Sequence, residues 1–161
     1  MLEVYSNECL AVTDLSEVFT DLVRAEIRLY NGLEGRMRAA HGISLGNFEF
    51  MRLIDERDRV RVNDIAQSIA ITVGAVSKGV DRLEGAGWVR REPNPENRRS
   101  SLLVLTDEGT ALLAAARVTY RAGLRDLLGE KLDPASMAHL ASSLAELRER
   151  LESAGVGLPT G

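Results

Sequence analysis

Hydrophobic residues recur every three or four positions along most of this chain, which is the period of amphipathic helices. The longest run covers residues 14–41, where Asp14 and Glu17 form a capping pair and Gly42 follows the end. Similar runs predict helices at residues 45–55, 64–69, 73–84, 107–127 and 134–153. Each of them follows a good helix-capping residue: Ser44, Asn63, Thr72, Thr106 and Asp133. The chain is therefore expected to be mostly helical.

The pattern changes between residues 85 and 105. Gly85 and Gly87 end a helical run, and residues 88–92 and 102–105 are typical of short strands. The turn-rich tip between them, residues 93–97, is followed by Arg98 and Arg99. A further extended piece is expected at residues 60–62. The expected fold class is therefore mostly α with a small β-hairpin, which directly follows a pair of helices.

The last expected helix carries a narrow apolar stripe. Its members are spaced three and four residues apart, as in helices that pack on another helix: Met137, Leu140, Leu144, Leu147 and Leu151. Left uncovered, this stripe would be a larger apolar patch than monomers usually expose. It therefore predicts dimerisation.

Residues 63–84 have the layout of a helix-turn-helix, with Ala70 and Ile71 as the turn. In the second helix, Val73, Val76, Val80 and Leu83 make the expected buried stripe. The remaining residues form an outward, polar or small face: Thr72, Gly74, Ala75, Ser77, Lys78, Asp81 and Arg82. Such a face can approach DNA closely, and Lys or Arg can bind phosphate or guanine. The two helices alone are equally compatible with a structural hairpin that has a solvated polar face.

The basic hairpin favours DNA binding over that structural alternative. Adjacent like charges at Arg98 and Arg99 suit a tip that meets an anion, and a narrow minor groove attracts inserted arginine. Taken alone, however, the pair is better explained as part of a solvated loop.

Residues 62–109 resemble the MarR family of bacterial regulators. The resemblance rests on five stretches: Asn63-Asp64-Ile65-Ala66, residues 72–84, Gly87-Trp88-Val89-Arg90-Arg91, Asn97-Arg98-Arg99, and residues 105–109. Residues 42–48 resemble the family's second helix, and the helix order agrees over nearly the whole chain. One departure is Asn97, where the family usually has an acidic residue that orients the wing arginine; Glu96 is its nearest substitute.

The resemblance implies a winged helix-turn-helix inside a helical homodimer. Residues 1–42 and 106–153 would form the dimerisation region, residues 43–105 the DNA-binding region, and residues 154–161 a loose tail. The recognition helix would enter the major groove, and the wing, with Asn97, Arg98 and Arg99, the minor groove of double-stranded DNA. The implied function is a repressor on a palindromic operator, released by a small aromatic or phenolic effector.

Charge and composition add little to this hypothesis. The net charge is −4, but residues 59–99 hold eight Lys or Arg against five Asp or Glu. No apolar run is long enough for a bilayer, and nothing resembles a secretory signal. A single cysteine, Cys9, fits a reducing compartment, so a cytoplasmic protein without membrane association is expected.

Other functions find weaker support. His41, His139 and Cys9 lack metal-ligand spacing, and no nucleophile or phosphate-loop motif is present, so neither an enzyme nor a cofactor is expected. Some regulators that resemble this chain sense peroxide through a thiol near the first helix. The residues around Cys9 do not match that group, so an ordinary, partly buried cysteine is expected there. The main alternative is a protein-interaction dimer that has lost DNA binding.

Overall fold

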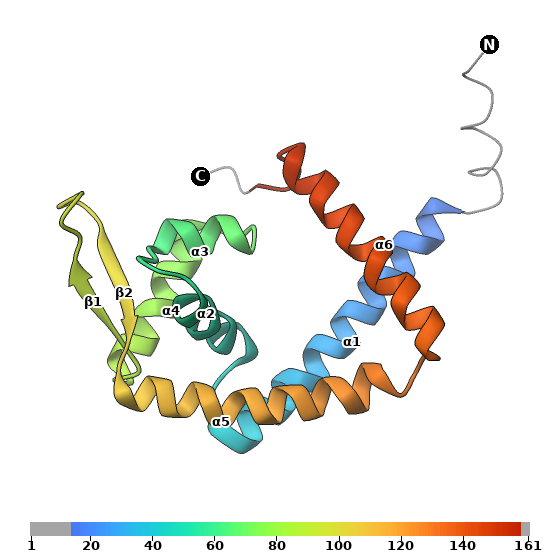
Figure 1. Cartoon of the computed structure of the whole chain (residues 1–161), viewed down its shortest axis with the longest axis horizontal. Coiled ribbons are helices and arrows are strands. Elements are labelled where there is room, and N and C mark those ends of the chain that lie inside the picture. The colour runs from blue at the N-terminus through green and yellow to red at the C-terminus, as the bar shows by residue number, and fades with distance from the viewer. Residues whose placement is uncertain (1–13, 159–161) are drawn as a thin grey trace, which may run out of the picture.

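The computed structural model describes residues 14–158. Helices and one hairpin follow one another along the chain (Figure 1): α1 (Leu15–His41), α2 (Leu45–Glu56), α3 (Val62–Ser68), α4 (Val73–Gly85), β1 (Val89–Pro93), β2 (Ser101–Leu105), α5 (Asp107–Leu124), the π-helical turn η2 (Arg125–Gly129) and α6 (Pro134–Ser153). The strands pair antiparallel, with Val89 opposite Leu105 and Pro93 opposite Ser101. The predicted fold class, mostly helical with one hairpin, is confirmed.

Most helix ends lie where the capping residues predict them. The side chains of Asp14, Ser44, Thr72, Thr106 and Asp133 each accept a backbone N–H from the first turn of the helix that follows. Gly42 ends α1 in the left-handed conformation, at φ 66°, where a side chain would be strained. Local chemistry alone therefore sets these boundaries.

The start of α3 differs from the prediction. Arg61 rather than Asn63 is the capping position, because the Asp64 carboxylate accepts the backbone N–H of Arg61 at 2.9 Å. Val62 is thereby helical, and the extended piece before it ends at Arg61; the Val60 carbonyl accepts the N–H of Leu103 at 2.8 Å. The fifth helix also ends earlier than predicted, at Leu124, and continues as the π-helical turn.

One hydrophobic core lies within the unit formed by α2, α3, α4 and the hairpin, closed by the end of α1 and the first half of α5. We call this unit the winged-helix lobe. Its fully buried side chains come from every one of these elements: Met37, Ile43, Phe48, Met51, Ile65, Val76, Val80, Leu83, Val89 and Leu113. Packing is tight at Gly79, where an added Cβ would lie 2.2 Å from a ring carbon of Phe50. The α4 helix is thus held closely against α2.

Among the residues that the structure describes, those outside the lobe form no such core. The first half of α1 and all of α6 lie away from the hairpin (Figure 1), and α6 buries none of its residues. The large exposed apolar side chains gather on these two helices: Leu15, Val18, Phe19, Leu22, Val23, Ile27 and Tyr30 on α1, and Leu140, Leu144, Leu147 and Leu151 on α6. None of the described helices is long and apolar enough to cross a membrane.

Candidate nucleic-acid interface

The second helix of the helix-turn-helix, α4, presents a polar face to solvent. The turn before it is tight: Ala70 adopts φ 53°, and the N–H of Ile71 bonds the carbonyl of Ala66 at 3.1 Å. Thr72 then caps the helix by accepting the N–H of Ala75 at 3.2 Å. The predicted outward residues are exposed, except for the half-buried Ser77: Thr72, Gly74, Ala75, Ser77, Lys78, Asp81 and Arg82.

Val73 was predicted to be buried, and this is wrong. Val73 is 50% exposed, whereas Val76, Val80 and Leu83 are completely buried. Val73 is the first residue of α4, and helix periodicity cannot tell whether a neighbouring element reaches as far as that first turn. The leading turn of α4 therefore presents an isopropyl group beside its small and hydroxyl-bearing residues.

Asp81 lies on the polar face but is already engaged. Its carboxylate accepts from the Arg91 guanidinium of β1 at 2.7 Å, and Glu84 pairs with the same guanidinium. These ion pairs join the recognition helix to the first strand of the hairpin. Asp81 therefore braces α4 against the wing, a role that the sequence pattern did not reveal because the partner lies on another element.

The hairpin tip is held together by its asparagines. Asn94 is buried; its amide N–H donates to Ser100 Oγ at 2.9 Å, and its carbonyl oxygen accepts the N–H of Glu96. Asn97 Oδ1 accepts the backbone N–H of Arg99 at 3.0 Å. An aspartate could make that same bond, so Asn97 retains a backbone contact that orients the tip.

Glu96 does not substitute as the partner of the wing arginine. Its carboxylate pairs with Arg59 at 3.1 Å instead. Arg98 and Arg99 are both exposed, and within residues 14–158 no carboxylate pairs with either of them. The wing thus presents two cationic side chains whose charge is not locally neutralised.

A notch lies between α4, the start of α3 and the hairpin. It has a volume of about 290 Å³, and its walls include Ser77 of α4, Arg61 and Asn63, Arg91, and Arg99 with the serines beside it. Arg61 and Arg91 were not among the predicted site residues, because neither lies on the predicted outward face of α4 or at the hairpin tip; in the structure each pairs with a carboxylate. Hydrogen bonds from the side chain and the backbone of Arg61 lower the pKa of the Asp64 carboxyl below its usual value, although partial burial opposes them.

The two histidines have ordinary structural contacts. A ring nitrogen of His41 lies 2.7 Å from Thr119 Oγ1, between α1 and α5, and His139 bonds the carbonyl of Ala135 within α6. Within residues 14–158, no group of three or more His, Cys, Asp or Glu is placed to hold a metal ion. Cys9 lies outside the described residues.

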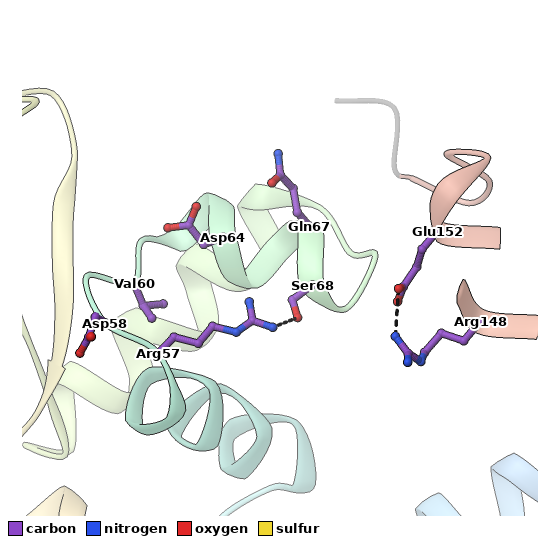
Figure 2. A pocket seen from close by; sticks show the side chains of 8 residues that line it. All are labelled: Arg57, Asp58, Val60, Asp64, Gln67, Ser68, Arg148 and Glu152. Atoms are coloured by element: carbon purple, nitrogen blue, oxygen red, sulfur yellow. Dashed lines mark hydrogen bonds and ion pairs between the residues drawn. The ribbon is translucent and has the colours of Figure 1, made fainter. Parts of the chain in front are cut away.

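A large open hollow separates α3 from α6 (Figure 2). It has a volume of about 670 Å³ and a mostly charged or polar lining that includes Arg57, Gln67, Arg148 and Glu152. Figure 2 shows Arg57 bonded to Ser68 on one side, and Arg148 bonded to Glu152 on the other. Arg148 and Glu152 neutralise each other, Arg57 donates to a neutral hydroxyl, and no aromatic side chain lines the hollow. It therefore does not suit an aromatic effector.

Aromatic side chains gather elsewhere, where α1, α2 and α5 meet. The rings of Phe48 and Tyr120 lie 4.9 Å apart, and Tyr30 is near the start of α2, where Glu34 accepts the N–H of Leu45 at 2.5 Å. Tyr30 is 42% exposed, and the partial burial of its hydroxyl, followed by the negative charge of Glu34, raises the pKa of that hydroxyl. A tyrosine hydroxyl is protonated at neutral pH even without such a shift, so the Tyr30 hydroxyl can donate a hydrogen bond.

A helix-turn-helix, a basic hairpin and a notch between them define a winged-helix DNA-binding protein. The model of the MarR family matches residues 43–101 of this chain. The chain belongs to the MarR family of DNA-binding transcription regulators, a class of binding proteins and not of enzymes.

Three relatives illustrate the match. The Streptomyces coelicolor MarR family regulator Sco3205, solved in complex with DNA, is 26% identical with a TM-score of 0.81, covering 89% of this chain and 91% of that one. The transcriptional repressor CouR, solved with a 23-mer DNA duplex, is 30% identical with a TM-score of 0.73, covering 80% and 89%. The Bacillus subtilis HTH-type regulator YdgJ is 27% identical over 93 residues, which span 58% of this chain and 57% of YdgJ.

Proposed function

We propose that the protein is a homodimeric repressor that binds a palindromic operator and is released from it by a small molecule. The observation that carries the DNA-binding part is the notch. Ser77, from the polar face of α4, and Arg99, one of the two unneutralised wing arginines, line the same depression. A major-groove reader and a minor-groove reader are thereby on one side of the lobe.

Dimerisation is supported by the uncovered apolar faces of α1 and α6. A two-fold dimer through residues 1–42 and 106–153 would cover both and would present two equivalent recognition helices. The operator is then an imperfect palindrome, with half-site centres about one helical turn, or roughly 10 bp, apart.

The recognition helix divides the work along its length. Its first turns, with Thr72, Gly74, Ala75 and Ser77, read base edges, because small side chains permit close approach. Lys78 and Arg82 lie further along the exposed face and neutralise phosphates. Asp81 acts indirectly, through its ion pair with Arg91.

Repression and release by a ligand are the finer parts of the proposal. That CouR is described as a repressor supports the sign of regulation. The meeting point of α1, α2 and α5 supports an aromatic or phenolic effector, since Phe48 and Tyr120 offer ring faces and Tyr30 a hydroxyl. Working on chromosomal DNA, the protein would act in the cytoplasm.

The test is to select binding duplexes from a random-sequence library, footprint the recovered duplex, and measure the mass of the complex by sedimentation. We expect a symmetric footprint and a complex of two chains with one duplex. A footprint on one asymmetric half-site would contradict the dimer model. If no sequence is enriched, the alternative of a protein-interaction dimer is favoured. Phenolic acids are then screened for release of the recovered duplex.

A further inference from the structure

The notch contains more hydrogen-bond donors than the recognition helix and the wing tip require. Three arginines from three elements, together with three hydroxyl groups, contribute to its walls: Arg61, Ser77, Arg91, Arg99, Ser100 and Ser101. Arg61 is the residue before α3, Arg91 lies in β1, and Arg99 follows the hairpin tip. A wall of this composition suits an anionic ligand that also offers many oxygen acceptors.

Two of these arginines are held in place by carboxylates of the scaffold. Arg61 donates through Nε and Nη2 to Asp64, at 2.9 and 2.7 Å. Arg91 donates through Nη2 to Asp81 at 2.7 Å and through Nη1 to Glu84. Each guanidinium has five N–H groups, and these contacts use two of them. The carboxylates fix the orientation of each planar group while N–H groups remain for a further acceptor.

The position of the notch identifies that acceptor. When the recognition helix enters a major groove and the wing enters the adjacent minor groove, one DNA strand separates the two grooves. That strand must pass between α4 and the hairpin, where the notch lies. We infer that the notch receives the sugar–phosphate backbone of this strand, and that Arg61 and Arg91 donate to its phosphate oxygens. The inference rests on the DNA-binding function proposed above.

The arrangement gives these two arginines a different task from that of Arg98 and Arg99. The wing arginines can follow the shape of a groove because no carboxylate restrains them. Arg61 and Arg91 are restrained, so they bind a phosphate at one place only and fix the register of the lobe on the duplex.

The test uses the duplex recovered by selection and a series of copies with one neutral methylphosphonate at successive positions. Arg61→Ala should weaken wild-type duplex binding roughly 10-fold and lower the slope of log affinity against log salt by about two, because a dimer has two notches. A methylphosphonate between the major-groove and minor-groove contacts should weaken duplex binding by the wild-type protein. The same substitution should not further weaken duplex binding by Arg61→Ala.

Matched variants separate phosphate binding from bracing. Arg90→Ala removes the arginine beside Arg91, which pairs with Glu92, and should leave affinity and salt slope unchanged. Asp81→Asn breaks the brace but keeps Arg91, and should also keep the wild-type salt slope, whereas Arg91→Gln should lower it. Thermal unfolding checks that each variant is folded.

The outcomes distinguish a failure of the notch inference from a failure of the proposed function. If the wild-type protein gives a symmetric footprint but Arg61→Ala and Arg91→Gln retain its salt slope and its methylphosphonate sensitivity, the notch inference is wrong and the proposed function stands. If Asp81→Asn lowers the slope as much as Arg91→Gln, Arg91 only braces α4. If the wild-type protein binds no duplex, both proposals fail.

Discussion

The helices of the winged-helix lobe bury their apolar stripes. The first half of α1 and all of α6, which we call the outer helices, have the same hydrophobic pattern but expose it. Phe48 in the lobe is completely buried, whereas Phe19 on α1 is 66% exposed. Both residues lie on helices with apolar residues at regular three-to-four spacing. The lobe covers its stripes with its own chain, while α1 and α6 present theirs outward. Periodicity therefore tells which face of a helix needs a partner, but not whether the same chain supplies it.

The energetic consequence is large. Full burial of one large apolar side chain contributes about 1.5–3 kcal/mol, and α1 and α6 together present many such side chains. Within the lobe this free energy stabilises the fold of a single chain. On the outer helices it would become available only on association, as in the dimer proposed above.

The largest effect is expected when charges are placed in the exposed apolar stripe of α6. Leu144 and Leu147 are 40% and 46% exposed, so replacing both with Glu removes no buried side chain from the single chain. In a dimer the change buries charges without partners, and Leu144→Glu with Leu147→Glu should give monomers or insoluble protein that no longer binds specific DNA. Sedimentation measures the mass. Ala138→Glu with Ser142→Glu, on the opposite face of α6, is the control and should stay dimeric; a dimeric Leu144→Glu, Leu147→Glu variant would refute the model.

A change inside the lobe should act on folding instead. In Gly79→Ala the new methyl group would meet the Phe50 ring at 2.2 Å, and Phe50 is itself buried. We expect a loss of about 1–3 kcal/mol in the free energy of unfolding, measured with urea, as α4 is pushed from α2. Gly85→Ala meets no atom within 4 Å and is the control. Equal stability of the two variants would mean that the α2–α4 contact is looser than described.

The wing should affect binding without affecting folding. Arg99→Ala should weaken operator binding by about 1–3 kcal/mol and lower the salt slope by roughly two, because two wings are inserted. The unfolding free energy should hardly change, since the side chain is exposed. Arg98→Ala is the neighbouring comparison and should do less. Unchanged affinity and slope for Arg99→Ala would leave DNA recognition to α4 and the notch.

Two valines of α4 repeat the comparison within one helix. Val76 is completely buried and Val73 is 50% exposed. Val73→Ala should change the unfolding free energy by less than about 0.5 kcal/mol, whereas Val76→Ala should cost clearly more. If the Val73 methyl groups contact a thymine methyl, the variant should also lose the preference of the wild-type protein for thymine over deoxyuridine at one operator position. Titration of both duplexes measures this, and a preference kept in full excludes the contact.

The smallest effect is expected at the turn. Asn97→Asp keeps the bond from the Arg99 N–H and adds a charge, so operator affinity should hold or rise slightly, by a few tenths of a kcal/mol. Fluorescence anisotropy with the selected duplex measures it. A large loss would instead show that the Asn97 amide itself touches DNA.

Local signals in the sequence predicted most of the fold. Capping residues such as Ser44 and Thr106 act within a few positions of themselves, so their helices begin where expected. The start of α3 was missed because an acidic residue inside the helix, Asp64, does the capping in place of Asn63. Of the candidate site, the sequence indicated only residues that could be expected to be exposed, on the outward face of α4 and at the hairpin tip. The bracing of α4 by Arg91 involves residues on two elements, and periodicity carries no signal for such a contact.

The α5 helix joins the two regions and can act as a lever. Its 18 residues make it about 27 Å long. Near its start the N–H of Thr106 bonds the carbonyl of Trp88 at the root of the wing, while towards its end Gly123 packs closely on Leu33 of α1. A tilt of about 10° at the α1 end would displace the wing root by roughly 5 Å, more than the 3.4 Å rise of one base pair. In a dimer, a ligand that slightly changes the angle between α1 and α5 would thus shift each wing away from the minor groove that it enters.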